Sequence, residues 1–178
     1  MQEVHRAAFA SHAESVGALV DDLRRSLATE RGLSLVAADE DDSVIGHVLF
    51  TRNLLDASER SVDVQVLSPL GVAPDQQRKG VGSELVRHGL RTLGEGGVPA
   101  VFLEGSATYY SRLGFTSAVE LGFRRPSLRI PLAAFQVCLL PAYEPWMTGT
   151  LVYRHEFWDH DAVGLRPSDP RWHLVRDS

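Results

Sequence analysis

The sequence has a single cysteine, a single lysine and no apolar run long enough to cross a bilayer. One thiol, Cys138, excludes an intramolecular disulfide framework and a cysteine-based metal cluster. Because a membrane span takes about 20 consecutive apolar residues, no membrane partner is expected, and no secretory signal peptide is recognised. These absences predict a cytoplasmic protein.

Positive charge is also scarce. The chain has 18 Lys and Arg against 23 Asp and Glu, which gives a formal net charge of −5. A chain of this charge is not a typical nucleic-acid binder, so no nucleic-acid partner is expected. The length of 178 residues and the 44% hydrophobic content are those of one ordinary globular domain. The only lysine, Lys79, stands between Arg78 and Gly80.

Hydrophobic periodicity predicts a mixed α/β domain over residues 1–157, followed by a polar C-terminal tail over residues 158–178. Helices are expected near the N-terminus and over residues 13–28, 80–93 and 109–113. Strands are expected over residues 33–38, 44–50, 62–72, 100–103, 136–140 and 149–153. Residues 52–60 are expected to be a polar connection. Ser68-Pro69 interrupts its strand, and because proline cannot donate to a ladder, a bulge is expected there.

A glycine-rich loop surrounds the lysine. Residues 76–83 follow a predicted strand and open a predicted helix, where unpaired amides and the helix dipole favour an anion. Gly80 and Gly82 allow a phosphate to approach the backbone, and neighbouring side chains add donors. This pattern favours a phosphorylated cofactor, although the glycines are also consistent with a simple tight turn.

Two common phosphate-binding loops do not fit. A Walker A loop ends in Gly-Lys-Ser/Thr, whereas Lys79 precedes Gly80. A dinucleotide fingerprint needs a third glycine where Leu85 stands.

Residues 72–85 resemble the acyl-CoA loop of the GNAT superfamily of N-acetyltransferases, whose Gln/Arg-x-x-Gly-x-Gly/Ala pattern is matched by Gln77, Gly80 and Gly82. The resemblance implies an α/β (α+β) fold with a mixed, mostly antiparallel sheet, splayed at the cofactor strand and flanked by helices. It also implies acetyl-CoA as cosubstrate. The cofactor-binding residues that it implies are Leu70, Gly71, Val72, Gln77, Arg78, Lys79, Gly80, Val81, Gly82 and Ser83.

A second segment, residues 109–115, resembles the family's aromatic-Tyr-x-x-x-Gly-Phe motif. The resemblance implies that Tyr110 lies beside the CoA sulfur and protonates the departing thiolate, a step that a phenol with a pKa near 10 can perform. The likeness covers roughly residues 7–157. Family members begin with a strand before the first helix, and that strand is expected to be absent here. Dimers are common in the family, so a homodimer is compatible with the resemblance.

The group that takes the proton from the amine is left open between Asp63, Glu104 and a water relay. His155 and His160 resemble a zincin motif at first sight. Their spacing places them about 140° apart on a helix rather than on one face, so no metal site is expected.

The sequence therefore predicts an N-acetyltransferase that moves an acetyl group from acetyl-CoA directly to a primary amine of a small molecule or a protein. One alternative is a non-catalytic acyl-CoA-binding or regulatory domain that keeps the loop. Another is a nucleotide-phosphate binder that uses the same helix end.

Overall fold

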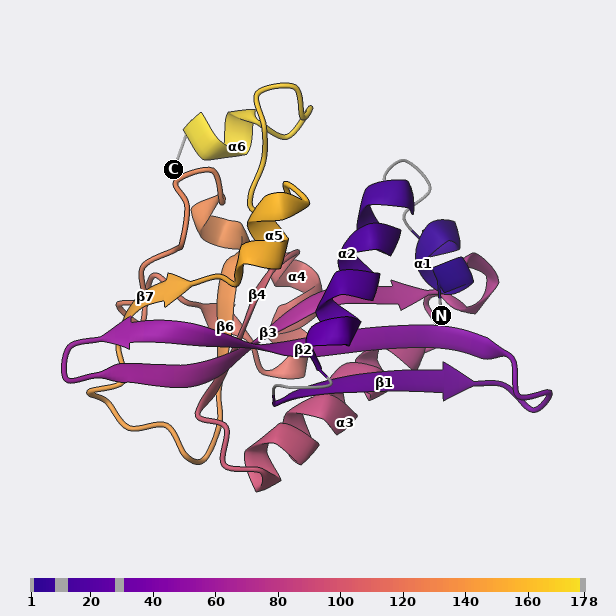
Figure 1. Ribbon diagram of the computed structural model, residues 1–178, viewed down its shortest axis with the longest axis horizontal. Helices are drawn as coiled ribbons and strands as arrows, with labels where there is room; N and C mark the ends of the chain where they lie inside the picture. The colour runs from indigo at the N-terminus through magenta and orange to yellow at the C-terminus, as the bar shows by residue number, and fades with distance from the viewer. Residues whose placement is uncertain (1, 9–12, 28–30, 177–178) are drawn as a thin grey trace.

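The computed structural model describes residues 2–8, 13–27 and 31–176, and a seven-stranded sheet runs through the middle of the molecule (Figure 1). The strand order is β1 (Gly32–Ala38), β2 (Val44–Ala57), β3 (Ser61–Val72), β4 (Ala100–Glu104), β6 (Phe135–Leu139) and β5 (Thr116–Ser117), and β7 (Gly149–Val152) pairs with the far end of β2. Every pairing is antiparallel except that of β3 with β4. The mixed, mostly antiparallel sheet implied by the resemblance is confirmed.

Helices cover both faces of this sheet. They are α1 (Gln2–Ala8), α2 (Ala13–Ser26), α3 (Val81–Glu95), α4 (Ala107–Tyr110), α5 (His155–Asp159) and α6 (His173–Arg176). In Figure 1, α1, α2, α5 and α6 lie on one side of the long strands and α3 on the other. The predicted helix over residues 13–28 is α2, with residue 28 outside the described part, and the one over residues 80–93 is α3.

Alternation along β2 divides the apolar residues between two cores. Leu49 belongs to the core beneath α2, whereas Val48 and Phe50 belong to the core beneath α3. Successive side chains of a strand point to opposite faces, so a sheet covered on both sides needs apolar residues at consecutive positions. The same alternation in β4 places Val101 and Leu103 in the core beneath α3 and Phe102 in the core beneath α2.

The sheet opens between β3 and β4. The two strands pair only at Gln65 with Val101 and at Val66 with Phe102. On its other edge, β3 stays paired with β2 as far as Val72. The register shifts on the way, because Val48 pairs with Leu70 whereas Phe50, two residues further along β2, pairs with Leu67, three residues back along β3. The bulge expected at Ser68-Pro69 is therefore confirmed. Beyond Val66 the two strands separate and leave a gap in the sheet.

The polar connection expected over residues 52–60 is wrong, because β2 continues to Ala57. This stretch pairs on both edges, with Asn53 opposite Val64 of β3 and Leu55 opposite Leu151 of β7. Pairing on two sides outweighs the weak strand propensity of its polar residues.

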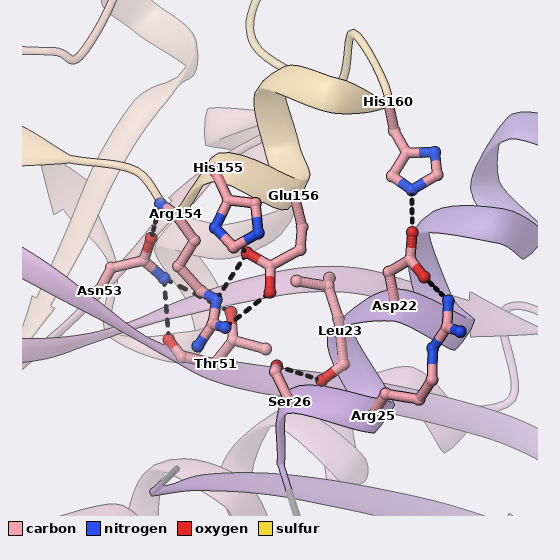
Figure 2. A network of polar contacts seen from close by, with 10 residues as sticks. All are labelled: Asp22, Leu23, Arg25, Ser26, Thr51, Asn53, Arg154, His155, Glu156 and His160. Carbon is pink, nitrogen blue, oxygen red and sulfur yellow. Dashed lines mark hydrogen bonds and ion pairs between the residues drawn. The ribbon is translucent and has the colours of Figure 1, made fainter. Parts of the chain in front are cut away.

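The residues after Tyr153 pack on the α2 side of the sheet. A buried ion pair joins Arg154 to Glu156, with Nη2 to Oε1 at 2.6 Å, and Asn53 Oδ1 accepts the Arg154 N–H at 2.9 Å (Figure 2). His160 Nε2 donates to Asp22 Oδ2 of α2 at 2.6 Å. These contacts hold α5 against β2 and α2, and Val163 just beyond it is fully buried in the core.

Two buried histidines lie between α1 and the sheet. His5 Nε2 and His47 Nδ1 share a hydrogen bond of 2.6 Å, and His47 Nε2 lies 2.9 Å from Ser34 Oγ. Burial lowers the pKa of His5 to about 4 and, together with its histidine neighbour, the pKa of His47 to about 3. Both imidazoles are therefore neutral at neutral pH.

This pair predicts that stability falls as the pH drops from about 6.5 towards 4, because the unfolded chain takes up protons there that the folded chain does not. The fall in the urea midpoint between pH 7 and pH 5 should be smaller in His47→Gln than in the wild type. His88→Gln, on the exposed face of α3, is the matched control for loss of an imidazole. An equal fall in wild type and His47→Gln would contradict the prediction.

Candidate active site

The loop between β3 and α3 ends in an uncapped helix N-terminus. After the short 3₁₀ turn Pro74–Gln76, Arg78 and Gly80 adopt left-handed conformations with φ of 63° and 94°. Among the described residues, no side chain caps α3, and the first intrahelical bond runs from the Glu84 N–H to the Gly80 carbonyl. The amides of residues 81–83 thus stay outside the helix's own bonding and are available to an anion.

Gly82 and Tyr109 come into contact at this helix end. A Cβ on Gly82 would lie 2.9 Å from Tyr109 Oη and 3.4 Å from Val72 Cγ2. Tyr109 Oη also lies 3.4 Å from Ser83 Oγ. The hydroxyl therefore lies against the first turn of α3, a placement that the sequence analysis missed although the doubled tyrosine was visible.

The remaining predicted cofactor-binding residues lie on the same two adjoining segments. Gln77 Nε2 donates to the Val72 carbonyl at 3.1 Å and so ties the loop to the end of β3. Lys79 Nζ donates to Gln76 Oε1 at 3.2 Å, and its side chain is exposed. Leu70 and Val81 pack at the edge of the core beneath α3. The end of β3, the loop and the start of α3 thus adjoin one another. Gly71 differs from its neighbours, because a Cβ there would point towards α1 and lie 2.7 Å from His5 Nδ1.

Tyr110 lies at the end of β4 on this same side. Its ring fits against Gly105, where a Cβ would lie 2.5 Å from Tyr110 Cε2. Tyr109 and Phe115 meet the ring edge-on, with centroids 4.9 and 5.6 Å away. Burial, with a smaller effect of Tyr109, raises the pKa of Tyr110 well above the usual 10. The phenol is therefore protonated near neutral pH and has a proton to donate.

Glu104 lies at the end of β4 on the opposite face. Its Oε2 accepts the Gly164 N–H at 3.0 Å, and the Tyr153 hydroxyl donates to the same carboxylate. Burial raises the pKa of Glu104 to about 7, against the lowering effects of Tyr153, the Gly164 amide and the Arg129 guanidinium. A carboxylate with this pKa can both hold and release a proton near neutral pH.

Asp63, another candidate for the proton acceptor, lies elsewhere. It forms an exposed ion pair with Arg52 at 2.6 Å. With Gly96 and Gly97 it lines a hollow at the C-terminal end of α3, about 20 Å along the helix from the loop. Of the two carboxylates weighed from the sequence, only Glu104 lies at the gap.

The two histidines of the zincin-like stretch face different partners. His155 is exposed and lies 3.4 Å from Glu156, whereas His160 contacts Asp22. Over residues 2–8, 13–27 and 31–176, no cluster of three His, Cys, Asp or Glu side chains is arranged to hold a metal ion. In the same part of the chain, no helix is long and apolar enough to cross a membrane.

Comparison with known proteins places this geometry among acetyltransferases. A sequence model of the Acetyltransferase (GNAT) family matches residues 1–115. The chain is 38% identical over 125 residues to the uncharacterized N-acetyltransferase YjhQ of Escherichia coli K12, covering 70% of this chain and 66% of YjhQ, slightly under two thirds of its length. It is 36% identical over 137 residues to the uncharacterized N-acetyltransferase YhbS of the same strain, covering 74% of this chain and 75% of YhbS.

Two solved structures resemble this fold over most of the chain. The crystal structure of E. coli YhbS in complex with CoA has a TM-score of 0.75 at 30% identity, covering 88% of this chain and 83% of YhbS. That of a GNAT family acetyltransferase from Brucella melitensis in complex with acetyl-CoA has a TM-score of 0.67 at 31% identity, covering 88% of both chains. The uncapped helix end, the open sheet and these likenesses agree: the chain belongs to the GNAT family of acetyltransferases.

Proposed function

We propose that this protein transfers the acetyl group of acetyl-CoA directly to a primary amine. The observation that carries the proposal is the gap between β3 and β4, which has an uncapped helix end and Tyr110 on one face and Glu104 on the other. A thioester held on the α3 side and an amine arriving from the α2 side would meet in this gap, so that transfer needs no covalent enzyme intermediate.

The α3 side has the features of an acetyl-CoA site. The amides of residues 81–83 and the left-handed Gly80 would hold the pyrophosphate, with Arg78, Lys79 and Ser83 as nearby donors. Past Val66, no strand of the described residues pairs with the edge of β3 that faces the gap, so the backbone groups on this edge of residues 70–72 would be free to bond the pantetheine arm and the thioester carbonyl. YhbS and the Brucella melitensis protein were crystallised with CoA and acetyl-CoA, which supports this assignment.

Tyr110 would supply the proton that the CoA thiolate needs as it leaves. Burial raises the pKa of this phenol, so it is still protonated when the thiolate forms and has a proton to donate to the sulfur. The acceptor amine would belong to a small molecule or a protein, and Glu104 lies where its nitrogen would arrive.

Thiol release on purified protein tests this function. Wild-type protein with acetyl-CoA and a panel of primary amines should release free CoA in proportion to amine, and acetyl-CoA should raise Tm where ATP and NAD do not. A thiol reagent will also report Cys138, so a blank without acetyl-CoA is subtracted. Acetyl-CoA binding without turnover on any amine would favour the non-catalytic domain, and a Tm shift with ATP or NAD instead would favour the nucleotide binder.

A further inference from the structure

A cavity of about 590 Å³ opens beside the gap on the side of the sheet away from α3. Its lining at the sheet consists of Val66 and Ser68 of β3, Glu104 at the end of β4 and Gly105 just after it. Gly105 separates this cavity from the ring of Tyr110 on the other face. The cavity therefore reaches the place where the acetyl group would be delivered, and its size suits a small organic molecule.

Its outer walls come from the C-terminal third of the chain. Side chains from the loop before β6, from α5 and from the segment after it surround the opening, and these are Pro131, Ala134, Phe157, Ala162, Leu165 and Leu174. All of these side chains are apolar. An occupant would thus bury hydrocarbon or an aromatic ring against them.

Of the described residues that line the cavity, two are charged, Glu104 and Arg171. Among the described lining residues, Glu104 is the only carboxylate. Arg171, a further lining residue, is held by Asp169 through two hydrogen bonds, with Nη2 to Oδ2 at 2.8 Å and Nε to Oδ1 at 3.0 Å. A ligand with one ammonium group finds one anionic partner here, whereas a second ammonium group would be buried without one.

Hydrogen bonds hold the Glu104 carboxylate in one orientation. The Tyr153 hydroxyl and the Gly164 amide both donate to it, and the Arg129 guanidinium is the nearby positive charge. Tyr153 is itself buried and is packed against Phe157 with ring centroids 5.0 Å apart. These donors orient the carboxylate and still leave it lone pairs for a ligand, because a carboxylate accepts up to about four hydrogen bonds.

We propose that this cavity is the acceptor site, that it takes a primary amine carried on a single apolar or aromatic body, and that Glu104 binds the ammonium group and accepts its proton. The inference rests on the proposed acetyl transfer and adds the class of acceptor to it.

Two protons leave the ammonium nitrogen during the proposed transfer. Glu104 takes one proton from R–NH₃⁺, and the freed amine attacks the thioester carbonyl to form a C–N bond. The C–S bond then breaks, and Tyr110 protonates the thiolate to give CoA–SH. The nitrogen loses its second proton, which restores Tyr110 through water, and Glu104 releases its proton to solvent. The products are the N-acetyl amine, CoA–SH and one proton.

The first experiment compares acceptors on the wild-type protein. Phenethylamine should be acetylated with a kcat/KM at least about 10-fold above that of spermidine, a difference of about 1.4 kcal/mol. Phenethyl alcohol, which lacks the nitrogen, should give no thiol release. A kcat/KM for spermidine equal to or above that of phenethylamine would overturn the inference.

The second experiment changes the cavity. Glu104→Gln should lower kcat/KM for phenethylamine by about 100-fold or more and leave the Kd for acetyl-CoA within about twofold. In the wild type, kcat/KM should rise with pH to a plateau above about 7, and the variant should lose that rise. Leu165→Trp, which fills the cavity, should raise KM for phenethylamine, whereas Leu128→Trp, at a position 78% exposed, should not.

The outcomes separate the two proposals. Failure of the wild type to bind acetyl-CoA or to acetylate any amine would remove the proposed function itself. Acetyl-CoA binding and acetylation that favour spermidine, or that persist undiminished in Glu104→Gln, would leave the function standing and remove the acceptor class or the role of Glu104.

Discussion

Gly82→Glu is expected to weaken acetyl-CoA binding by about 100-fold or more, a loss of at least about 2.7 kcal/mol. Gly82 lies in the first turn of α3, against Val72 and the hydroxyl of Tyr109. A glutamate there displaces the tyrosine hydroxyl and places a negative charge at the helix end that would hold the pyrophosphate. Isothermal titration calorimetry with acetyl-CoA measures the loss.

Two further variants test whether a loss of affinity in Gly82→Glu comes from a negative charge at this position and not from damage to the helix. His88→Glu adds the same side chain on the exposed face of α3 and should leave the affinity within about twofold, since it lies beyond the first turn. Gly82→Ala should fall between the wild type and Gly82→Glu, because the one contact of its methyl group under 3.0 Å is with the movable end of Tyr109. Wild-type affinity in Gly82→Glu would show that acetyl-CoA binds elsewhere.

Tyr110→Phe is expected to lower kcat about 100-fold and to leave the Kd for acetyl-CoA nearly unchanged. The change removes one hydroxyl and keeps the ring that packs against Gly105 and Phe115. Without this donor, the thiolate must take its proton from water, so the effect falls on the chemical step. Steady-state kinetics at saturating amine, combined with calorimetry, measures the two quantities separately.

The neighbouring tyrosine provides the matched control. Tyr109→Phe also removes a single hydroxyl, but that hydroxyl lies against Ser83 and the start of α3. We expect Tyr109→Phe to change the Kd for acetyl-CoA more than kcat, the reverse of Tyr110→Phe. Full turnover in Tyr110→Phe would remove Tyr110 from the chemistry.

The proposed acetyl-CoA side of the site was predictable from the sequence, because the conformational preferences of single residues determine it. A proline cannot donate to a ladder, so Ser68-Pro69 marks the bulge in the part of β3 that borders the gap. A left-handed residue at the N-cap of α3 favours glycine, so Gly80 marks the loop. The predicted short helix ends at Gly114, whose φ is 90°, for the same reason.

The proposed acceptor site was not predictable, because parts of the chain far apart in the sequence line it. Glu104 could be identified as a candidate, but its partner Gly164 lies 60 residues away in the sequence. The C-terminal residues looked like a polar tail because their apolar members are isolated, and packing alone brings Val163 into the core and Leu165 to the cavity. Neither the secondary-structure propensity of a residue nor the hydrophobic periodicity of a segment indicates contacts between residues so far apart in the sequence.

Two separate parts of the chain, residues 66–106 and 131–174, line the cavity. The family match ends at residue 115, after the loop, Glu104 and Tyr110, whereas the outer cavity walls come from residues 131–174. Substitutions in those walls would reshape the proposed acceptor site and leave the proposed acetyl-CoA site intact. Descendants of one ancestral enzyme would thus be able to keep acetyl-CoA as the donor and to take different amines through changes confined to the last third of the chain.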